Sequence, residues 1–447
     1  APLEIADGQA TISWLNNDKG FQLDGRNIDV KAKAVHARGG FRYLQPANDE
    51  PWLGILAGIS TDDGSQAWRY FPENLMGKDL VDYLSGAIQG GEADNATLVY
   101  GGNPQLFPYK HNEGQFEVLV PLRNAKFAFQ PDWPALTNLA IELDFINDGL
   151  WMKTDGVNLG GVRASNLTAV IPDYSKEKLL IDADIKGPGK AVGPYLEETP
   201  LKDSLGATLQ ELKLDGDVNA RLHLDIPLNG ELVTAKGEVT LRNNSLFIKP
   251  LDSTLKNLSG KFSFINGDLQ SEPLTASWFN QPLNVDFSTK EGTKAYQVAV
   301  NLNGNWQPAK IGFLPAAVNE ALSGSVAWDG KVGIELPYHA GATYNVELNG
   351  DLKNVSSHLP SPLAKPAGEP LPVNVKVDGN LNSFELTGQA GADNHFNSRW
   401  LLGQKLTLDR AIWAADSKTL PPLPEQSGVE LNMPPMNGAD WLAPVPK

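Results

Sequence analysis

The chain has 447 residues, of which 41% are hydrophobic and 20% are charged, and its formal net charge is −16 at pH 7. This composition is that of a folded protein longer than one compact core, and it excludes an intrinsically disordered chain. The negative charge argues against a nucleic-acid partner and against electrostatic docking on an anionic membrane, while the absence of cysteine excludes disulfides and thiolate metal sites.

The first sixty residues have the pattern of strands. Apolar and polar residues alternate between Ala10 and Trp14 and again over residues 28–34, which is typical of half-buried strands. The apolar run at residues 53–59 is too short to cross a bilayer and is expected to be a buried strand. We expect residues 1–60 to form a partial leading repeat.

An internal repeat relates residues 120–150 to residues 239–269, where 12 of 31 aligned positions are identical. Both copies contain the tripeptides Leu-Arg-Asn and Phe-Ile-Asn, at residues 122–124 and 241–243 and at residues 145–147 and 264–266. A match of this length at one offset indicates a protein built from repeats.

Each copy of the repeat has the pattern of a β-hairpin. In the first copy the apolar residues of 141–145 alternate with acidic residues, and Asn-Asp-Gly follows at 147–149. In the second copy Phe262 and Phe264 alternate with polar residues before Asn-Gly at 266–267. Alternation that ends in such a pair predicts antiparallel strands with one apolar face.

Helix is expected to be a minor component. Residues 78–84 place Leu80, Val81 and Leu84 on one helical face, and residues 201–205 and 318–322 are weaker candidates. Strands, prolines and short helices recur in a similar order around these segments.

This recurrence predicts three repeats, at residues 61–187, 188–304 and 305–420, followed by a Pro-rich C-terminal segment at residues 421–447. The third repeat is the most diverged, because a Pro-rich loop at residues 356–372 replaces the Phe-Ile-Asn hairpin.

Strands with one apolar face must cover that face. An array of β-sandwich domains would do so with a second sheet in each domain. A continuous curled sheet would do so by lining a groove, and it explains why strands recur across the repeat junctions without clear linkers. The residue pattern leaves both architectures open.

The repeated Leu-Arg-Asn and Phe-Ile-Asn segments, the insertions of helix and proline, and the strand at Leu214–Val218 resemble the AsmA-like family of Gram-negative envelope proteins. The similarity is strongest to one large member over about Tyr70 to Trp306. The resemblance implies a mainly β fold: an elongated, strongly curved antiparallel repeat sheet, taco-like and half-open, with a hydrophobic groove and a few short helices. It also implies a periplasmic body that an N-terminal helix anchors in the inner membrane, so that we expect this chain to be a middle piece.

The function implied by the resemblance is a bridge-like conduit for phospholipids between the inner and outer membranes. Exposing an acyl chain to water costs about 0.8 kcal/mol per CH₂, or about 13 kcal/mol for about sixteen carbons. A lipid that crosses an aqueous compartment therefore needs its tails covered at each step. The expected partners are phospholipid acyl chains, together with the two membranes through parts of the protein outside this chain.

The residues expected to line the groove are the apolar, alternating positions of the strands. They are Phe127, Phe129, Ile141, Leu143, Phe145, Leu222, Leu224, Leu246, Ile248, Phe262, Phe264, Val285, Phe287, Val298, Val300, Val373, Val375 and Val377. Each one singly is also what an ordinary hydrophobic core would contain, and only their alignment over many strands favours a conduit.

No catalytic or metal-binding pattern is present in the sequence. The six histidines have no pair at metal-ligand spacing, and no nucleophile-elbow, P-loop or dinucleotide motif occurs. We therefore expect no enzyme activity, no cofactor and no metal. The alternative function is a β-sandwich array that serves as an envelope scaffold, adhesin or glycan-binding module, and an enzyme acting on envelope polysaccharide is a third, weaker alternative.

Overall fold

The computed structural model describes residues 4–249, 253–312 and 314–442. The first three residues of the expected leading repeat and the last five of the expected Pro-rich segment lie outside the described residues. Within the described part, 25 strands belong to one hydrogen-bonded sheet and two more form a small second sheet. The prediction of a mainly β protein with a few short helices is confirmed.

The chain divides into two compact units, which are described separately. The N-terminal unit takes in the described residues up to Gly187, together with Glu198–Pro200 and Asn219–Gly237. The C-terminal unit takes in Pro188–Glu197, Leu201–Val218 and the described residues from Glu238 onward. The boundaries of the three repeats stay a prediction.

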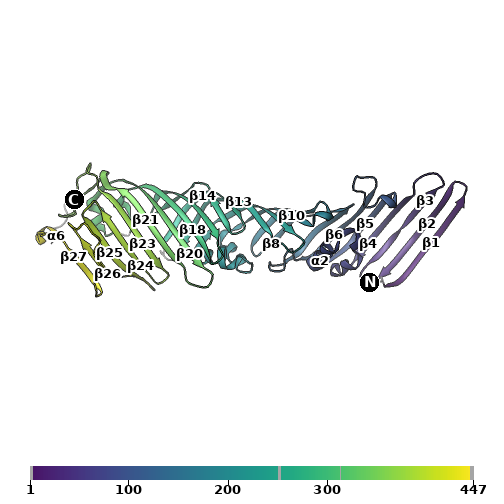
Figure 1. Ribbon diagram of the computed structural model, residues 1–447, viewed down its shortest axis with the longest axis horizontal. Helices are drawn as coiled ribbons and strands as arrows, with labels where there is room; N and C mark the ends of the chain where they lie inside the picture. The colour runs from purple at the N-terminus through teal and green to yellow at the C-terminus, as the bar shows by residue number, and fades with distance from the viewer. Residues whose placement is uncertain (1–3, 250–252, 313, 443–447) are drawn as a thin grey trace. The chain divides into compact units, whose positions relative to one another are not determined.

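The N-terminal unit contains eleven strands for the most part, which are β1 (Ile5–Asn17), β2 (Gly20–Ala32), β3 (His36–Pro46), β4 (Trp52–Thr61), β5 (Ile88–Gly102), β6 (Gln115–Phe127), β7 (Leu136–Ile146), β8 (Gly149–Leu159), β9 (Val162–Ile171), β10 (Lys178–Pro188) and β12 (Asp217–Pro227). Its helical segments are η1 (Gly64–Tyr70), α1 (Glu73–Met76), α2 (Lys78–Ala87), η2 (Pro104–Leu106) and η3 (Tyr174–Lys176). Each strand from β1 to β10 pairs antiparallel with the next, and β12 pairs with β10 (Figure 1).

The strands of the C-terminal unit are β11 (Leu212–Asp215), β13 (Thr234–Ile248), β14 (Ser253–Ile265), β15 (Asp268–Ser271), β16 (Leu274–Trp278), β17 (Gln281–Glu291), β18 (Ala295–Trp306), β19 (Leu322–Gly324), β20 (Val326–Pro337), β21 (Thr343–Asp351), β22 (Val355–Ser357), β23 (Pro372–Asn380), β24 (Ser383–Ala390), β25 (Asn394–Leu402), β26 (Leu406–Ala414) and β27 (Gly428–Asn432). Its helical segments are η4 (Gly189–Ala191), α3 (Val192–Glu197), the π-helical turn η5 (Lys202–Gly206), α4 (Ala207–Glu211), η7 (Pro308–Lys310), α5 (Ala316–Ala321), η8 (Leu352–Asn354) and α6 (Gly438–Leu442).

In the C-terminal unit an antiparallel series runs from β17 through β18, β20, β21, β23, β24 and β25 to β26 (Figure 1). The strand β27 pairs with β26 in parallel, so the sheet is mixed where the sequence predicted an antiparallel one. The strands β19 and β22 pair with each other as the small second sheet. The Pro-rich loop expected at residues 356–372 separates β22 from β23, and in the described residues it contains no long strand.

The predicted hairpins of the repeat are confirmed. Strands β7 and β8 are joined by Asn147 and Asp148, and strands β14 and β15 by Asn266 and Gly267. Asn147 has φ 51° and Asn266 has φ 53°, in the left-handed region that Asn tolerates better than most residues. The two-residue loops with Asn in this conformation match the right-handed twist of the flanking strands.

The other repeated asparagines mark β-bulges. Asn124 has φ 51°, and it lies where β6 has one residue more than β7 between two pairs of partners. Asn138 on β7 and Asn257 on β14 are also left-handed, and each lies at a register shift. Bulges bend a strand and increase its twist, so the asparagines of the repeat encode local curvature of the sheet.

Replacing Asn124 by valine is therefore expected to destabilise the protein by about 1–2 kcal/mol, because a β-branched residue pays the full cost of the left-handed conformation. Glycine at the same position should be tolerated within about 0.5 kcal/mol, since it adopts this conformation freely. Urea unfolding of both variants measures the difference. Equal losses for valine and glycine would show that the asparagine side chain, rather than its backbone conformation, is what the bulge requires.

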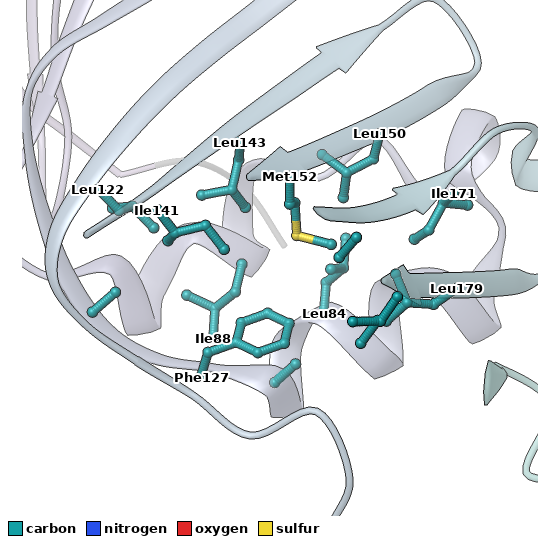
Figure 2. Close-up of a cluster of buried hydrophobic side chains, with 14 of the residues drawn as sticks. Leu84, Ile88, Leu122, Phe127, Ile141, Leu143, Leu150, Met152, Ile171 and Leu179 are labelled. Atoms are coloured by element: carbon teal, nitrogen blue, oxygen red, sulfur yellow. The ribbon is translucent and has the colours of Figure 1, made fainter. Parts of the chain in front are cut away.

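The hydrophobic core of the N-terminal unit lies between the sheet and helix α2. The prediction of a helix at residues 78–84 is confirmed, and Leu80 and Leu84 are buried. Figure 2 shows Leu84 facing a group of side chains that comes from successive strands of the sheet. The labelled members of this group are Ile88, Leu122, Phe127, Ile141, Leu143, Leu150, Met152, Ile171 and Leu179.

Candidate functional site

The C-terminal unit has a continuous apolar row across its strands. Residues directly opposite each other in antiparallel strands project to the same face of a sheet. From β17 to β24 the register places one apolar residue of each strand in line, and we call this row the apolar ladder. Its members are Phe287, Val300, Val332, Val346, Val377 and Leu386.

Two further rows of uncharged, mainly apolar residues lie on the same face, one on each side of the apolar ladder and two residues away from it along each strand. One neighbouring row consists of Val285, Leu302, Gly330, Leu348, Val375 and Gly388. The other consists of Thr289, Val298, Ile334, Tyr344, Gly379 and Phe384. Phe262 of β14 extends the face, because its ring centroid lies 5.5 Å from that of Phe287.

The opposite face of the same strands is polar. The row that alternates with the apolar ladder consists of Asp286, Asn301, Lys331, Glu347, Lys376 and Thr387. Side chains of this polar face bond to one another: Asn301 Nδ2 donates to Asp286 Oδ1 at 2.8 Å, and Asn374, two residues from Lys376 on β23, donates through Nδ2 to Glu347 Oε1 at 3.0 Å. Because one face is apolar and the other is hydrogen-bonded, the sheet is amphipathic over its whole width from β17 to β24.

Solvent reaches part of the apolar face of this unit. All six members of the apolar ladder are half-buried. By contrast, Leu84, Leu143 and Leu150 in the core of the N-terminal unit are at most 2% exposed. The apolar face of the C-terminal unit is therefore incompletely covered by protein, whereas in the N-terminal unit the part under α2 is sealed.

The predicted groove residues of the N-terminal unit lie in this sealed part. Phe127, Ile141, Leu143, Phe145 and Leu224 belong to the buried core, and Phe129 and Leu222 pack against it half-buried. These seven residues share one apolar interior, which is closed on one side by α1 and α2.

The predicted groove residues of the C-terminal unit lie mostly on its half-buried apolar face. Leu246 and Ile248 of β13 are opposite Leu214 and Leu212 of β11, and Phe264 of β14 is opposite Leu269. The rows described above contain Val285, Phe287, Val298, Val300, Val375 and Val377, of which Val285 and Val298 are buried. Phe262 contacts Phe287, and Val373 lies opposite Gly350 in a further row of the same face. Their role in binding a lipid stays a prediction.

Sequence reasoning missed the apolar residues of β20, β21 and β24. Val332, Val346 and Leu386 continue the apolar ladder, although none was predicted to line the groove. The alternation of β20 is weakened by Gly330 and Gly333, which carry no side chain that would mark a face. If glycine is allowed at either face when alternation is scored, the apolar positions of β20 are recognised as one face of a strand.

The charged groups of the C-terminal unit pair along the polar face. Lys261 Nζ donates to Glu238 Oε1 at 2.8 Å, and this hydrogen bond raises the pKa of the ammonium.

Among the described residues there is no group of three or more histidines and carboxylates arranged to hold a metal ion. Nor does any helix in the described ranges have the length and apolar character needed to cross a membrane. The apolar face on the other side of β17 to β24 offers contact with apolar groups.

Comparison with known proteins identifies relatives of the chain. The family model described as YhdP protein matches residues 1–446. The chain is 97% identical over 443 residues to the intermembrane phospholipid transporter YhdP of Escherichia coli (strain K12), and the match covers 99% of the chain. The chain spans 35% of the length of that relative. No solved structure matches the chain.

Proposed function

The chain belongs to the YhdP family, and from this premise we propose that it carries phospholipid acyl chains along the apolar face of its sheet, as one segment of a conduit between the inner and outer membranes. The relative at 97% identity is named an intermembrane phospholipid transporter. A location in the periplasm, as part of a protein anchored in the inner membrane, belongs to the same proposal.

The observation that carries the proposal is the half-buried apolar ladder. Six strands in succession, from β17 to β24, each contribute one apolar side chain, and solvent reaches all of these side chains in part. Burial of apolar area against an acyl chain gains about 25 cal/mol per Å². A row without charged groups offers the same environment at every strand, so a tail can slide along it without crossing a high barrier.

The proposal assigns the chain a non-enzymatic role, since acyl-chain contact makes and breaks no covalent bond. The glycan-binding alternative rested on an array of separate β-sandwich domains. The described strands form a different architecture, because 25 of them belong to one sheet. The polar face of β17 to β24 has its side chains engaged with one another, which does not favour it as a carbohydrate site.

Photo-crosslinking at adjacent residues tests the proposal. A benzophenone amino acid at Val300, on the apolar ladder, is expected to capture phospholipid at least tenfold more than the same residue at Asn301, which projects to the polar face. Mass spectrometry of the crosslinked chain measures the capture. Equal capture at the two positions, or capture at Asn301 alone, would contradict transport along the apolar face.

A further inference from the structure

Four aromatic side chains of the C-terminal unit gather around the turn between β16 and β17. The rings of Trp278 and Phe279 stack with centroids 4.9 Å apart, and Trp306 lies edge-on to both at 6.2 Å. The ring of Trp328 meets that of Trp306 at 4.9 Å, also nearly edge-on. We call these four residues the aromatic cluster.

Three members of the aromatic cluster, Trp278, Trp306 and Trp328, lie on the apolar face of the sheet. Trp278 of β16 is opposite Gln281, which is four residues before Val285 on β17 and hence on the same face. Gly304 of β18 is opposite Trp328 of β20, and Gly304 is four residues beyond Val300 on the same strand, hence on the same face. Trp306 follows two residues later on that face. Trp328 is also close to the start of β20, so the aromatic cluster lies at one rim of the apolar face.

The indole N–H groups of the aromatic cluster differ in their partners. Trp278 Nε1 donates to Ser253 Oγ at 2.7 Å, and Trp306 Nε1 donates to the carbonyl oxygen of Pro282 at 2.7 Å. Trp328 Nε1 is buried from solvent, and no acceptor for it occurs in the part of the chain that the structure describes. A buried donor without an acceptor costs free energy, so this N–H calls for an oxygen that the protein does not supply.

The buried polar side chain of Gln281, at the same rim, is already engaged. Gln281 is buried, its Nε2 donates to the carbonyl oxygen of Gln307 at 3.2 Å, and its Oε1 accepts from the Gln307 N–H at 2.7 Å. Gly304 carries no side chain, and the two indoles occupy the space above its backbone: a Cβ built there would lie 3.1 Å from Trp328 Nε1 and 2.9 Å from Trp306 Nε1. The absence of a side chain at residue 304 is what allows the two indole nitrogens to approach each other over the strand.

We propose that Trp328 Nε1 donates a hydrogen bond to an oxygen at the head-group end of a bound diacyl phospholipid, either an ester carbonyl or a phosphodiester oxygen. The proposal rests on the proposed function, because it takes the acyl chains to lie on the apolar ladder. An amphipathic ring with one N–H donor suits the boundary between the tails and the polar part of a lipid. Trp328 thereby fixes where the head-group end lies at this rim, while the rest of the face contacts the tails without regard to position.

The test replaces Trp328 by phenylalanine in the 447-residue chain, which keeps an aromatic ring and removes the N–H. The matched control is Trp441→Phe, because Trp441 belongs to helix α6 rather than to a strand of the sheet, and its indole already donates to the carbonyl oxygen of Ser361 at 3.2 Å. Binding is measured with two short-chain phosphatidylethanolamines of equal length, one with ester-linked and one with ether-linked chains. Near-UV circular dichroism and thermal unfolding establish that each variant is folded.

The unsubstituted chain and Trp441→Phe are expected to bind alike, and Trp328→Phe should bind the ester lipid about fivefold more weakly. If the ether lipid shows no such loss, the acceptor is the ester carbonyl; if it shows the same loss, the acceptor is the phosphodiester. Unchanged binding of both lipids by a folded Trp328→Phe chain would overturn the assignment and leave the proposed function standing. Binding of neither lipid by the unsubstituted chain would overturn both.

Discussion

Replacing Leu84 by alanine is expected to lower the free energy of unfolding of the N-terminal unit by about 3–4 kcal/mol, which is the typical cost of a cavity in a well-packed core. Leu84 has no exposed surface, and it faces strand residues such as Leu143 and Met152 in the core beneath α2 (Figure 2). Because the free energy of unfolding of many domains is only about 5 kcal/mol, the variant should also have a markedly lower melting temperature. Urea unfolding followed by circular dichroism measures the loss.

The control is Asp82→Ala on the exposed side of the same helix, where the carboxylate forms an i,i+4 ion pair with Lys78. Its cost should be below about 0.5 kcal/mol, because exposed pairs contribute little. A loss of less than about 1 kcal/mol for Leu84→Ala would mean that α2 is loosely held on the sheet. In that case the apolar face beneath it would be as accessible to a lipid as the apolar ladder is.

The local structure could be predicted from the sequence because its causes are local. Alternation identified β1 and β2, the Asn-Asp and Asn-Gly pairs identified two hairpins, and a 3.6-residue period identified α2. The apolar run at residues 53–59 identified β4, but the expectation that this strand is buried is wrong, because Leu56 is 65% exposed. The aligned asparagines of the two repeat copies, Asn124 and Asn243, both have left-handed backbones, with φ 51° and 53°. Because asparagine tolerates the left-handed conformation better than most residues, its presence at these positions predicts a positive φ.

The third instance of that motif shows where this reasoning stops. Asn124 and Asn243 each stand 16 residues after a proline, and Asn354 stands 17 residues after Pro337, but Asn354 ends the 3₁₀ helix η8 rather than forming a bulge. Asp351 decides the outcome, because its Oδ1 accepts from the backbone N–H of Lys353 at 2.9 Å and of Leu371 at 2.8 Å. An acceptor from one segment that binds a distant one is a tertiary contact, which spacing along the chain does not contain.

The sequence also could not predict which part of the sheet's apolar face a helix covers. The amphipathic pattern of residues 78–84 says that a helix has an apolar side, and Ile141 to Phe145 say that a sheet does. Neither pattern says that the two meet. Consequently Ile141, Leu143 and Phe145 were grouped with Val300 and Val377 as residues of one kind, although the structure buries the first three in a core and leaves the last two half-buried.

Replacing Val377 by aspartate is expected to reduce phospholipid binding by at least tenfold while leaving the fold intact. Val377 lies on the apolar ladder between Val346 and Leu386. A carboxylate there puts a charge against the acyl chain, and separating that charge from water costs several kcal/mol in an apolar setting. Because the position is half-buried, the carboxylate can reach water when no lipid is bound, so the loss of folding stability should be only about 1 kcal/mol.

The matched control places the same charge on the other face. Thr387→Asp on β24 lies opposite Lys376 of β23 on the polar face, where an added carboxylate meets a lysine. It should change lipid binding less than twofold. Phospholipid retained by the purified chains, quantified by mass spectrometry beside a thermal melt of each, gives both quantities. Loss of binding in Thr387→Asp as large as in Val377→Asp would show that the sheet responds to charge on either face, and unfolding of Val377→Asp would place Val377 in a sealed core like that beneath α2.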